Sequence, residues 1–398
     1  MTFISVEDCI KNLFEQEIKA VQTTTTAIID AKDHILAKDV IAKIDVPPAD
    51  NSSMDGYALR AGDVQDSNTL KISQRIQAGD TPLALEANTA ARIFTGAEVP
   101  AGADTIEIQE NCTADKHQVT FNEAIRADAN IRRQGQDIAS GSIVVKKGQR
   151  LRAQELGLLA SIGVEHVETY QPLKVAIVNT GNELVELGQP LKSGQIYNSN
   201  RYLIHGILSG WGFEVEHCDI VADNLADTKT ALAKMSETND VVITVGGVSV
   251  GEEDHIKPAV EALGEINIWK VSIKPGKPFA FGHIKNTPFI GLPGNPASVF
   301  ATLLVLARPF LLHQQGLNKA DLHINSHSAI ANFERKISSR EDYLRARYVD
   351  GNVEIYPNQS SGVLTSASWG NCFVKQSIGD EIKPNQAVSI LLYSDLLK

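Results

Sequence analysis

Cysteine is scarce in this sequence, and its distribution argues against a structural metal site. The 398 residues include 4 Cys, with no C-x-x-C pair and no histidines at ligand spacing beside them. A zinc site of the common structural kind is therefore not predicted. We interpret the cysteines as free thiols, which are typical of a protein in the reducing cytoplasm.

Basic residues and long hydrophobic runs are also in short supply. The formal net charge is -11, so a broad basic surface for nucleic acid is not expected. No run reaches the roughly 18 to 20 apolar residues of a membrane span, and the start MTFISVEDC lacks a signal-peptide pattern. The longest apolar segment, Ala297 to Leu312, contains Arg308 and Pro309. These two residues interrupt the apolar run, so we predict a buried helix rather than a membrane span, and no membrane association.

The length and the changing pattern of the sequence predict a multidomain protein of the α/β plus β class. A chain of this size usually forms about two to four domains. Short apolar alternations separated by glycine-rich turns indicate an inserted small β domain at 44–135. The flanking segments 1–43 and 136–170 would form a discontinuous first domain, followed by an α/β domain at 171–317. Residues 318–398 read as a C-terminal β-barrel-like domain, with Asp350-Gly351 in a hairpin turn.

Strand-like and helix-like segments alternate from Lys174 onward. This order predicts a central parallel sheet that helices cover on both faces. Ligands bind such sheets beyond the carboxyl ends of the strands. The loops NTGNEL, VADN, GGVSVGEED and GLPGNP fall at those ends. We therefore expect the functional site at that edge of the sheet.

The stretch DVVITVGGVSVGEEDH, residues 240–255, fits two chemistries. Its GVSVG spells the nucleophile elbow of a serine hydrolase around Ser249. However, no later histidine is placed as a triad member should be, and three adjacent carboxylates would oppose an oxyanion. The alternative is a loop that binds a phosphorylated ligand and its cation. We favour this second interpretation, and we read the lone His255 as a helix-surface or hydrogen-bonding residue rather than a metal ligand.

Two proline-rich loops each allow a structural or a binding role. The lysines of WKVSIKPGKP, at positions 270, 274 and 277, suit an oxyanion, although a solvated turn would look similar. In GLPGNP, Asn295 is a candidate N-cap and Pro296 suits the first helical position, which explains most of that motif. A free helix N-terminus also attracts anions. The sequence contains neither a P-loop nor a dinucleotide-binding fingerprint.

Taken together, the motifs resemble one known family. They are PPADNSSMDGYALR, RIFTGAEVPAGADTIEIQE, NIRRQGQDI, NTGNEL, IYNSNRY, GGVSVGEEDH, WKVSIKPGKPFAFG and GLPGNPASVF. This series is similar to that of the molybdopterin molybdenumtransferases, the MoeA family and the E domain of gephyrin. The resemblance extends over nearly the whole chain and is weakest after Gly316.

The resemblance implies an enzyme of molybdenum cofactor biosynthesis. Such an enzyme inserts molybdate into adenylylated molybdopterin and releases AMP with the help of Mg²⁺. A non-catalytic pterin-binding scaffold is the alternative that the gephyrin likeness keeps open, and the serine hydrolase is the disfavoured one. The family likeness also implies a cytoplasmic homodimer that contacts other proteins of molybdenum cofactor biosynthesis.

The family likeness further implies roles for individual residues. Glu183, Asp223 and Asp254 would serve the metal. The oxyanion and substrate residues would be Ser249, Lys270, Lys274, Lys277, Pro293, Pro296, Arg345 and Ser361. Asp55, Thr95, Arg132 and Asp137 would reach in from the inserted domain of the partner chain. The sequence departs from the family pattern at Asn182 and Asn224, where aspartate is common.

Overall fold

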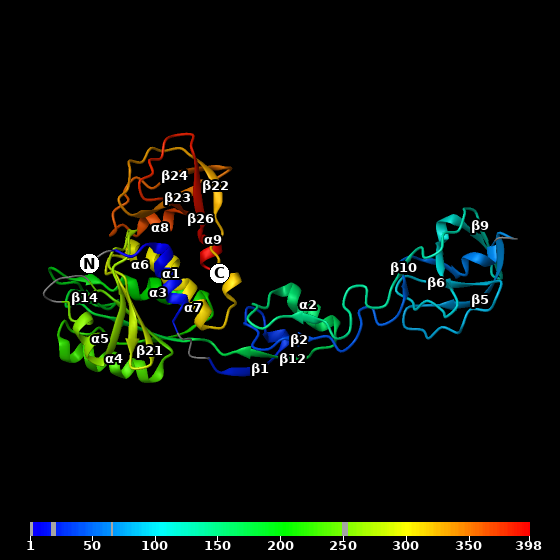
Figure 1. Ribbon diagram of the computed structural model, residues 1–398, viewed down its shortest axis with the longest axis horizontal. Coiled ribbons are helices and arrows are strands. Elements are labelled where there is room, and N and C mark those ends of the chain that lie inside the picture. The colour runs from blue at the N-terminus through cyan, green and yellow to red at the C-terminus, as the bar shows by residue number, and fades with distance from the viewer. Residues whose placement is uncertain (1–2, 17–20, 65–66, 249–253) are drawn as a thin grey trace.

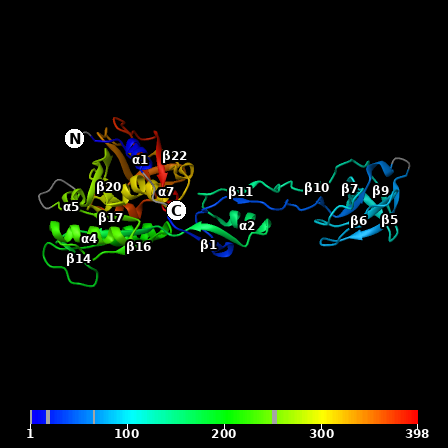
Figure 2. The same cartoon turned by 60° about the horizontal axis from the view of Figure 1, so that its bottom comes forward.

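The computed structural model describes residues 3–16, 21–64, 67–248 and 254–398. The molecule is elongated, as Figure 1 shows. Its α/β domain and C-terminal barrel form a body at one end, and the inserted β domain lies at the other. The first domain sits between them. The views in Figures 1 and 2 agree on this order.

A six-stranded sheet organises the α/β domain, in the order β16-β13-β17-β21-β20-β18. The first four strands are parallel to one another, and β20 runs antiparallel to both of its neighbours. The sheet is therefore parallel at its centre, as predicted, with an antiparallel addition at one edge. The strands are β13 (Lys174–Asn179), β16 (Glu214–His217), β17 (Val241–Val245), β18 (Gly264–Trp269), β20 (Ala280–Ile284) and β21 (Thr287–Leu292).

Helices cover both faces of this sheet. Along β13, Val175 and Ile177 belong to one core cluster, whereas Ala176 and Val178 belong to another. Because successive side chains of a strand point to opposite faces, each cluster marks one face. The first face packs against α3 (Ser199–Gly210) and α6 (Pro296–Thr302), and the second against α4 (Leu225–Thr238) and α5 (Ile256–Leu263).

The longest apolar segment forms a continuous buried helix, as predicted. After α6, a π-helical segment Leu303–Ala307 leads directly into α7 (Arg308–Gln314). Proline lacks the N–H for a regular helical hydrogen bond, and the wider turn just before Pro309 accommodates this defect. Residues Pro296–Gln314 are long and apolar enough to cross a membrane, but 89% of this window is buried inside the fold, which identifies a core helix.

The N-terminal helix α1 (Val6–Phe14) packs differently from the predicted division of the chain. Segment 1–43 was assigned as a whole to the first domain. The buried residues Val6, Cys9 and Leu13 instead belong to the same core cluster as the α/β domain. The physical reason is the apolar face of α1, which is buried against α7 and the π-helical segment before it.

The first domain is small and is built from two strand pairs and one helix. Strands β1 (Thr23–Ala27) and β12 (His166–Tyr170) pair antiparallel, as do β2 (Val40–Ile41) and β11 (Ile143–Val145). A 3-10 turn, Ile28–Asp30, follows β1. Helix α2 (Ala153–Ser161) covers a core that includes Leu36, Leu151 and Leu159.

The inserted domain contains a six-stranded sheet in the order β7-β4-β6-β5-β9-β8. Strands β3 and β10 pair at the end of the inserted domain that joins the first domain. The strands are β3 (Asn51–Ser52), β4 (Gly56–Leu59), β5 (Thr69–Ile76), β6 (Thr89–Ile93), β7 (Thr105–Ile108), β8 (Cys112–Ala114), β9 (Gln118–Phe121) and β10 (Ile131–Arg132). Short 3-10 turns occupy Ala61–Val64 and Gln109–Asn111.

The C-terminal domain is a closed five-stranded barrel. The order β23-β24-β22-β26-β25 returns to β23 through the β23–β25 pairing, and β19 (Ile273–Lys274) adds to β23 from the α/β domain. The predicted hairpin is confirmed, since Asp350 and Gly351 both adopt positive φ between β23 and β24. The elements are β22 (His327–Ala331), β23 (Glu341–Val349), β24 (Asn352–Ile355), β25 (Cys372–Gln376), β26 (Ala387–Leu392), α8 (Thr365–Trp369) and α9 (Tyr393–Leu396), after a 3-10 turn at Lys319–Leu322.

Candidate functional site

A cavity of about 330 Å³ lies at the carboxyl ends of the central strands. Strands β13, β17 and β21 all end there, which is the edge of the sheet that the sequence singled out. The parallel pair β14 (Leu184–Val185) and β15 (Ile196–Tyr197) forms one wall. The cavity is lined by Asn179, Thr180, Glu183, Leu184, Ile196, Tyr197, Asn198, Ser199, Asn200, Val245, Gly246, Gly294, Asn295, Pro296 and Gly362.

Glycine is required where β17 turns away from the cavity. Gly246 and Gly247 have φ of 87° and 62°, in the left-handed region that favours glycine. A Cβ on Gly247 would lie 2.7 Å from Cγ1 of Ile256, the first residue of α5. The turn therefore brings the chain close to α5. The predicted donor Ser249 follows this turn and lies outside the described residues.

Asn179, the last residue of β13, has an unusual side chain. It is 1% exposed, and neither its amide oxygen nor its amide nitrogen has a partner in the described part of the protein. Buried polar groups are nearly always hydrogen-bonded, and leaving one unpaired is costly. Asn200 also lines the cavity, and its amide oxygen is likewise buried without a partner. These amides have hydrogen-bonding capacity that a ligand in the cavity can use.

The sequence interpretation missed both asparagines. Asn179 lies in the motif NTGNEL and Asn200 in the motif IYNSNRY. The sequence does show that Asn179 ends an apolar strand. A polar amide at such a position is unusual and could have indicated a functional residue. Burial itself is visible only in the folded chain.

The three predicted metal ligands are not assembled into one site. Glu183 is exposed and lines the cavity. The carboxylate of Asp223 accepts a hydrogen bond from the backbone N–H of Asn182, at 2.9 Å. Among residues 3–16, 21–64, 67–248 and 254–398, no group of three or more His, Cys, Asp or Glu side chains could hold a metal ion. Asp223 instead joins the loop after β13 to the loop after β16.

The two departures from the family pattern have structural roles. The side-chain oxygen of Asn182 accepts the N–H of Asp223 at 3.2 Å, which completes a reciprocal pair between the two loops. Asn224 is the N-cap of α4, and its side chain accepts the N–H of Asp227 at 2.9 Å. Both asparagines therefore stabilise the loops beside the cavity as neutral groups.

The predicted lysines are distributed around the junction with the C-terminal barrel. The Nζ atom of Lys274 lies 3.1 Å from the carboxylate of Asp342, which is 1% exposed and also lies 3.5 Å from Arg335. Lys277 is exposed, with its Nζ atom 5.2 Å from the centre of the Phe3 ring. Lys270 has a positive φ of 74° and is half-buried. No described contact brings these three ammonium groups together at one point.

The barrel reaches the cavity through the loop 360–362. The N–H of Ala297, in the first turn of α6, donates to the backbone oxygen of Ser361 at 3.0 Å, and Gly362 lines the cavity. Pro296 occupies the first helical position as predicted, and Pro293 is buried just after β21. Asn295 is the N-cap residue, but its side chain makes no capping hydrogen bond.

Arg345 lies beneath this loop rather than in the cavity. It is fully buried; its Nε–H donates to Ser366 Oγ at 3.0 Å and its Nη2 to the Ser360 carbonyl at 3.2 Å. Burial lowers the pKa of its guanidinium group. Arg345 thus positions the residue next to Ser361.

The remaining predicted residues lie far from the cavity of the same chain. Asp55 accepts two hydrogen bonds from Thr95, at 2.8 Å from its N–H and 2.7 Å from its hydroxyl. Both belong to the inserted domain, whereas Arg132 is exposed on β10. Asp137 is exposed in the first domain, where its N–H donates to the carbonyl of Val46. Figures 1 and 2 show the inserted domain at the opposite end of the molecule from the α/β domain.

Comparison with known proteins decides the family. Three family models match in order: the MoeA N-terminal region (domain I and II) at residues 4–163, a probable molybdopterin binding domain at 176–313, and the MoeA C-terminal region (domain IV) at 331–393. A relative from Haemophilus influenzae named molybdopterin molybdenumtransferase is 38% identical over 407 residues, covering 99% of this chain and 100% of the relative. The chain belongs to the MoeA family. The predicted resemblance is confirmed.

Further relatives agree with this membership of the MoeA family. A Nostoc relative, also named molybdopterin molybdenumtransferase, is 33% identical over 398 residues, covering 94% of this chain and 90% of the relative. The solved molybdopterin biosynthesis moeA protein from Pyrococcus horikosii is 29% identical and superposes with a TM-score of 0.82 over 98% of this chain and 99% of that one. The predicted fold class, α/β plus β with an inserted β domain and a C-terminal barrel, is confirmed.

Proposed function

We propose that this protein inserts molybdate into adenylylated molybdopterin and releases AMP. The observation that carries this proposal is the cavity at the strand ends, with its unpaired buried Asn179, inside the segment that matches a probable molybdopterin binding domain. Membership of the MoeA family and relatives named molybdopterin molybdenumtransferase support the choice of reaction.

The residue types around the cavity suit the cleavage of a phosphoanhydride. In this reaction the P–O bond to the adenylate breaks, water supplies the new oxygen on phosphorus, and AMP leaves. Negative charge spreads over the phosphoryl oxygens, so catalysis depends on positioning and charge stabilisation rather than on a protein nucleophile. The amides of Asn179 and Asn200 orient the ligand by hydrogen bonds, and the lysines at 270, 274 and 277 attract its anionic groups. Ser249 then acts as a hydrogen-bond donor.

The residues around the cavity can hold Mg²⁺ if substrate phosphates and waters supply most of its ligands. Magnesium commonly binds one or two carboxylates together with substrate phosphates and waters. Glu183 offers an exposed carboxylate in the cavity wall, and Asp254 follows the turn after β17. A bound Mg²⁺ would stabilise the developing phosphoryl charge. One carboxylate oxygen of Asp223 already accepts a hydrogen bond from Asn182, which leaves the other oxygen for the cation.

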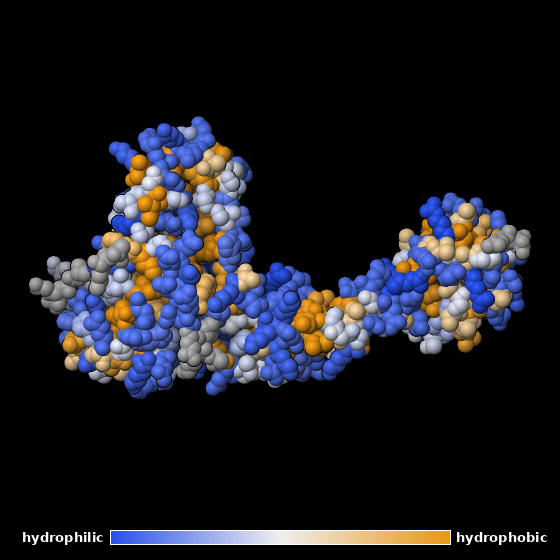
Figure 3. Space-filling model, viewed as in Figure 1, coloured by the Kyte–Doolittle hydropathy of each residue, from blue (hydrophilic) through white to orange (hydrophobic). Residues whose placement is uncertain are grey.

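We further propose that the working enzyme is a homodimer whose sites are shared between chains. Asp55, Thr95 and Arg132 belong to the inserted domain, which lies at the opposite end of the molecule from the α/β domain (Figure 1), and Asp137 lies in the first domain between them. A second copy brings these residues to the cavity. Figure 3 shows hydrophobic residues gathered on the first domain, and Ile29, Ile41, Ile44 and Ile143 are exposed there. An exposed apolar patch of this kind is typical of an interface.

The decisive experiment is AMP release from adenylylated molybdopterin on addition of molybdate and Mg²⁺, measured by chromatography. The native protein should release one AMP per substrate, and Asp254→Ala should release far less while remaining folded by circular dichroism. A protein that binds the pterin nucleotide but never releases AMP would be a scaffold instead. Unchanged turnover in Asp254→Ala would remove that residue from the proposed site.

A further inference from the structure

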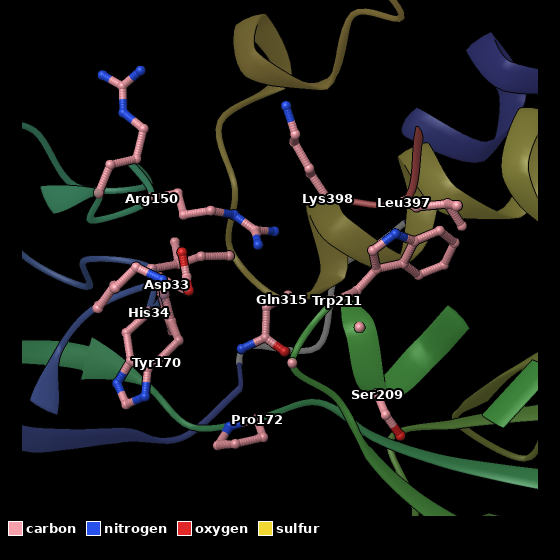
Figure 4. Close-up of a pocket in the computed structure, with 15 residues that line it drawn as sticks. Asp33, His34, Arg150, Tyr170, Pro172, Ser209, Trp211, Gln315, Leu397 and Lys398 are labelled. Atoms are coloured by element: carbon pink, nitrogen blue, oxygen red, sulfur yellow. Dashed lines mark hydrogen bonds and ion pairs between the residues drawn. The ribbon is translucent and has the colours of Figure 1, made fainter. Parts of the chain in front are cut away.

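Two cavities lined by cationic side chains lie where the first domain meets the α/β domain. They measure about 610 and 490 Å³ and share Arg150, Arg152 and Lys398. Neither shares a lining residue with the cavity at the strand ends. Figure 4 shows the larger one, with Arg150 and Asp33 on one side and Trp211 and Lys398 on the other. Their cationic residues are Lys32, Lys146, Arg150, Arg152, Arg308 and Lys398, against the acidic Asp33 and Asp321.

Arg308 is a buried cation without an ion-pair partner among the described residues. It is 7% exposed, its Nη2 donates to the carbonyl of Asp395 at 3.2 Å, and its Nε atom is buried with no partner in the described chain. Among the described residues it forms no ion pair with a carboxylate. Burial, and then the positive charge of Arg150 nearby, lower the pKa of Arg308 to about 10. A buried charge of this kind is costly unless something pairs with it.

Arg150 brings a second guanidinium group from the other domain. It is half-buried, and burial lowers its pKa. Its side chain takes part in none of the hydrogen bonds or ion pairs found among the described residues. The nearest compensating charge is Asp33, which already pairs with Lys32 at 2.9 Å. Arg152 is also engaged, by Glu155 at 2.7 Å. The acidic group that acts on Arg308 is Asp395, which already pairs with His327 at 3.0 Å. Arg150 and Arg308 therefore lie on opposite sides of a domain junction with no ion pair of their own among the described residues.

We propose that this junction binds a phosphate group, carried by a small metabolite or free in solution, between Arg150 of the first domain and Arg308 of the α/β domain. Guanidinium groups bind phosphate oxygens through paired hydrogen bonds. The recessed position of Arg308 and the size of the cavities favour a small ligand over the side chains of a second protein chain. Because the two arginines belong to different domains, the bound anion ties the first domain to the body.

The test is binding of inorganic phosphate and pyrophosphate to the full-length protein at constant ionic strength, by calorimetry and by the unfolding temperature. Native protein should bind saturably, and its Tm should rise with ligand concentration. Arg308→Met and Arg150→Met should each weaken binding at least ten-fold. The matched control is Arg347→Met, which removes an exposed arginine from the barrel and should bind as the native protein does.

The variants also separate this proposal from a purely structural role for Arg308. Without phosphate, Arg308→Met should be as stable as the native protein or more so, because a buried charge with no ion pair among the described residues has been removed. A lower Tm for Arg308→Met together with no saturable binding to the native protein would show that Arg308 only holds the Asp395 carbonyl. Should Arg308→Met fail to fold, Arg150→Met provides the same binding test at a half-buried position.

Two other results would overturn the proposal. Phosphate binding that survives in the Arg150→Met, Arg308→Met double variant but is lost in Lys274→Met would place the anion at the KPGKP loop, beside the C-terminal barrel. Dissociation of a dimer in either arginine variant, independent of phosphate and seen by sedimentation, would identify acidic side chains of a second copy as the occupant. Binding of inorganic phosphate is compared with binding of a phosphorylated sugar. This comparison distinguishes free phosphate from a phosphate group carried by a small metabolite.

Discussion

At the residue scale, some polar side chains of the proposed site have hydrogen-bond partners within the folded chain and others have none among the described residues. Asp55 accepts two hydrogen bonds from Thr95, and Asn198 accepts the N–H of Arg201 at the start of α3. Asn179, which lines the same cavity as Asn198, has no such partner among the described residues. Groups that are satisfied stabilise the fold, and the unsatisfied amide is available to a ligand.

Substitution of Asn179 and substitution of Asn198, which both line the cavity, should have opposite effects on the stability of the protein. Asn179→Val should leave the unfolding temperature unchanged or raised, because it removes an unpaired buried amide that costs about 1 to 3 kcal/mol. The same variant should weaken binding of adenylylated molybdopterin by about 1 to 3 kcal/mol. Asn198→Ala should destabilise the protein by about 1 kcal/mol through loss of an N-cap. Thermal unfolding and calorimetric titration measure both quantities, and a large loss of stability in Asn179→Val would contradict the assignment.

The carboxyl group of Asp55 should titrate below its usual range. Its pKa is lowered by the hydrogen bond from the backbone N–H of Thr95, and then by that from the Thr95 hydroxyl. A lowered pKa in the folded state means that the stabilisation is present above the unfolded pKa and is lost as the pH falls through the folded value. Thr95→Ala removes the hydroxyl and should raise the midpoint measured by NMR. Asp115, which is held by the N–H groups of His117 and Gln118, is the internal control and should not move.

At the scale of elements, close packing connects the loops to the long central helix. Gly276, in the KPGKP loop, has φ of 112°, and a Cβ there would lie 2.3 Å from Cγ2 of Thr302 on α6. The loop after β19 therefore lies directly against α6 because residue 276 has no side chain. The same helix begins at the cavity, with Pro296 in the cavity wall.

Gly276→Ala should accordingly destabilise the protein, by about 1 to 3 kcal/mol for the left-handed backbone alone. Adding Thr302→Ser removes the clashing methyl group but keeps the hydroxyl that donates to the Ser298 carbonyl at 2.8 Å. The double variant should therefore recover part of the loss. Gly157→Ala in α2 is the matched control, since a Cβ there meets nothing within 4 Å, and it should be neutral or stabilising. Urea unfolding of the four proteins tests this order.

At the scale of the whole molecule, the separation of the two groups of proposed site residues is the main feature. Glu183 and Asn179 lie in the body, whereas Asp55 and Thr95 belong to the inserted domain, which lies at the other end of the molecule (Figure 1). In the proposed shared site, each chain supplies its inserted domain to another copy. The proposal makes activity a property of the dimer.

Mixing two inactive variants tests the sharing of sites. Asp55→Ala and Glu183→Ala should each be inactive alone. After subunit exchange, one of the two sites in every mixed dimer contains both intact carboxylates. With random exchange half of the dimers are mixed, so about a quarter of native activity is the expected ceiling. No recovery, despite mixed dimers seen by native mass spectrometry, would mean that each site forms within one chain.

Local patterns in the sequence determined much of this fold. The alternation of apolar strands with helices after Lys174 predicted the parallel sheet, and its buried strand β13 matches that pattern residue by residue. Asp350-Gly351 predicted its hairpin because few other residue pairs adopt positive φ at adjacent positions. The loops at the strand ends were found in the same way. These features depend on backbone conformation and on side-chain periodicity, both of which neighbouring residues encode.

Tertiary contacts decided the rest. Only packing shows that α1 joins the core of the α/β domain, since its apolar face would suit any partner of the right shape. The sequence predicted a buried helix after Pro296, but only the structure shows the π-helical turn before Pro309, which keeps the helix continuous because leaving backbone groups unpaired in the core is costly. Only the folded chain shows that the carboxylate of Asp223 accepts a hydrogen bond from the backbone of the loop after β13. Asn179 and Arg308 became notable through burial without partners, and burial is a property of the folded chain that no local pattern of residues contains.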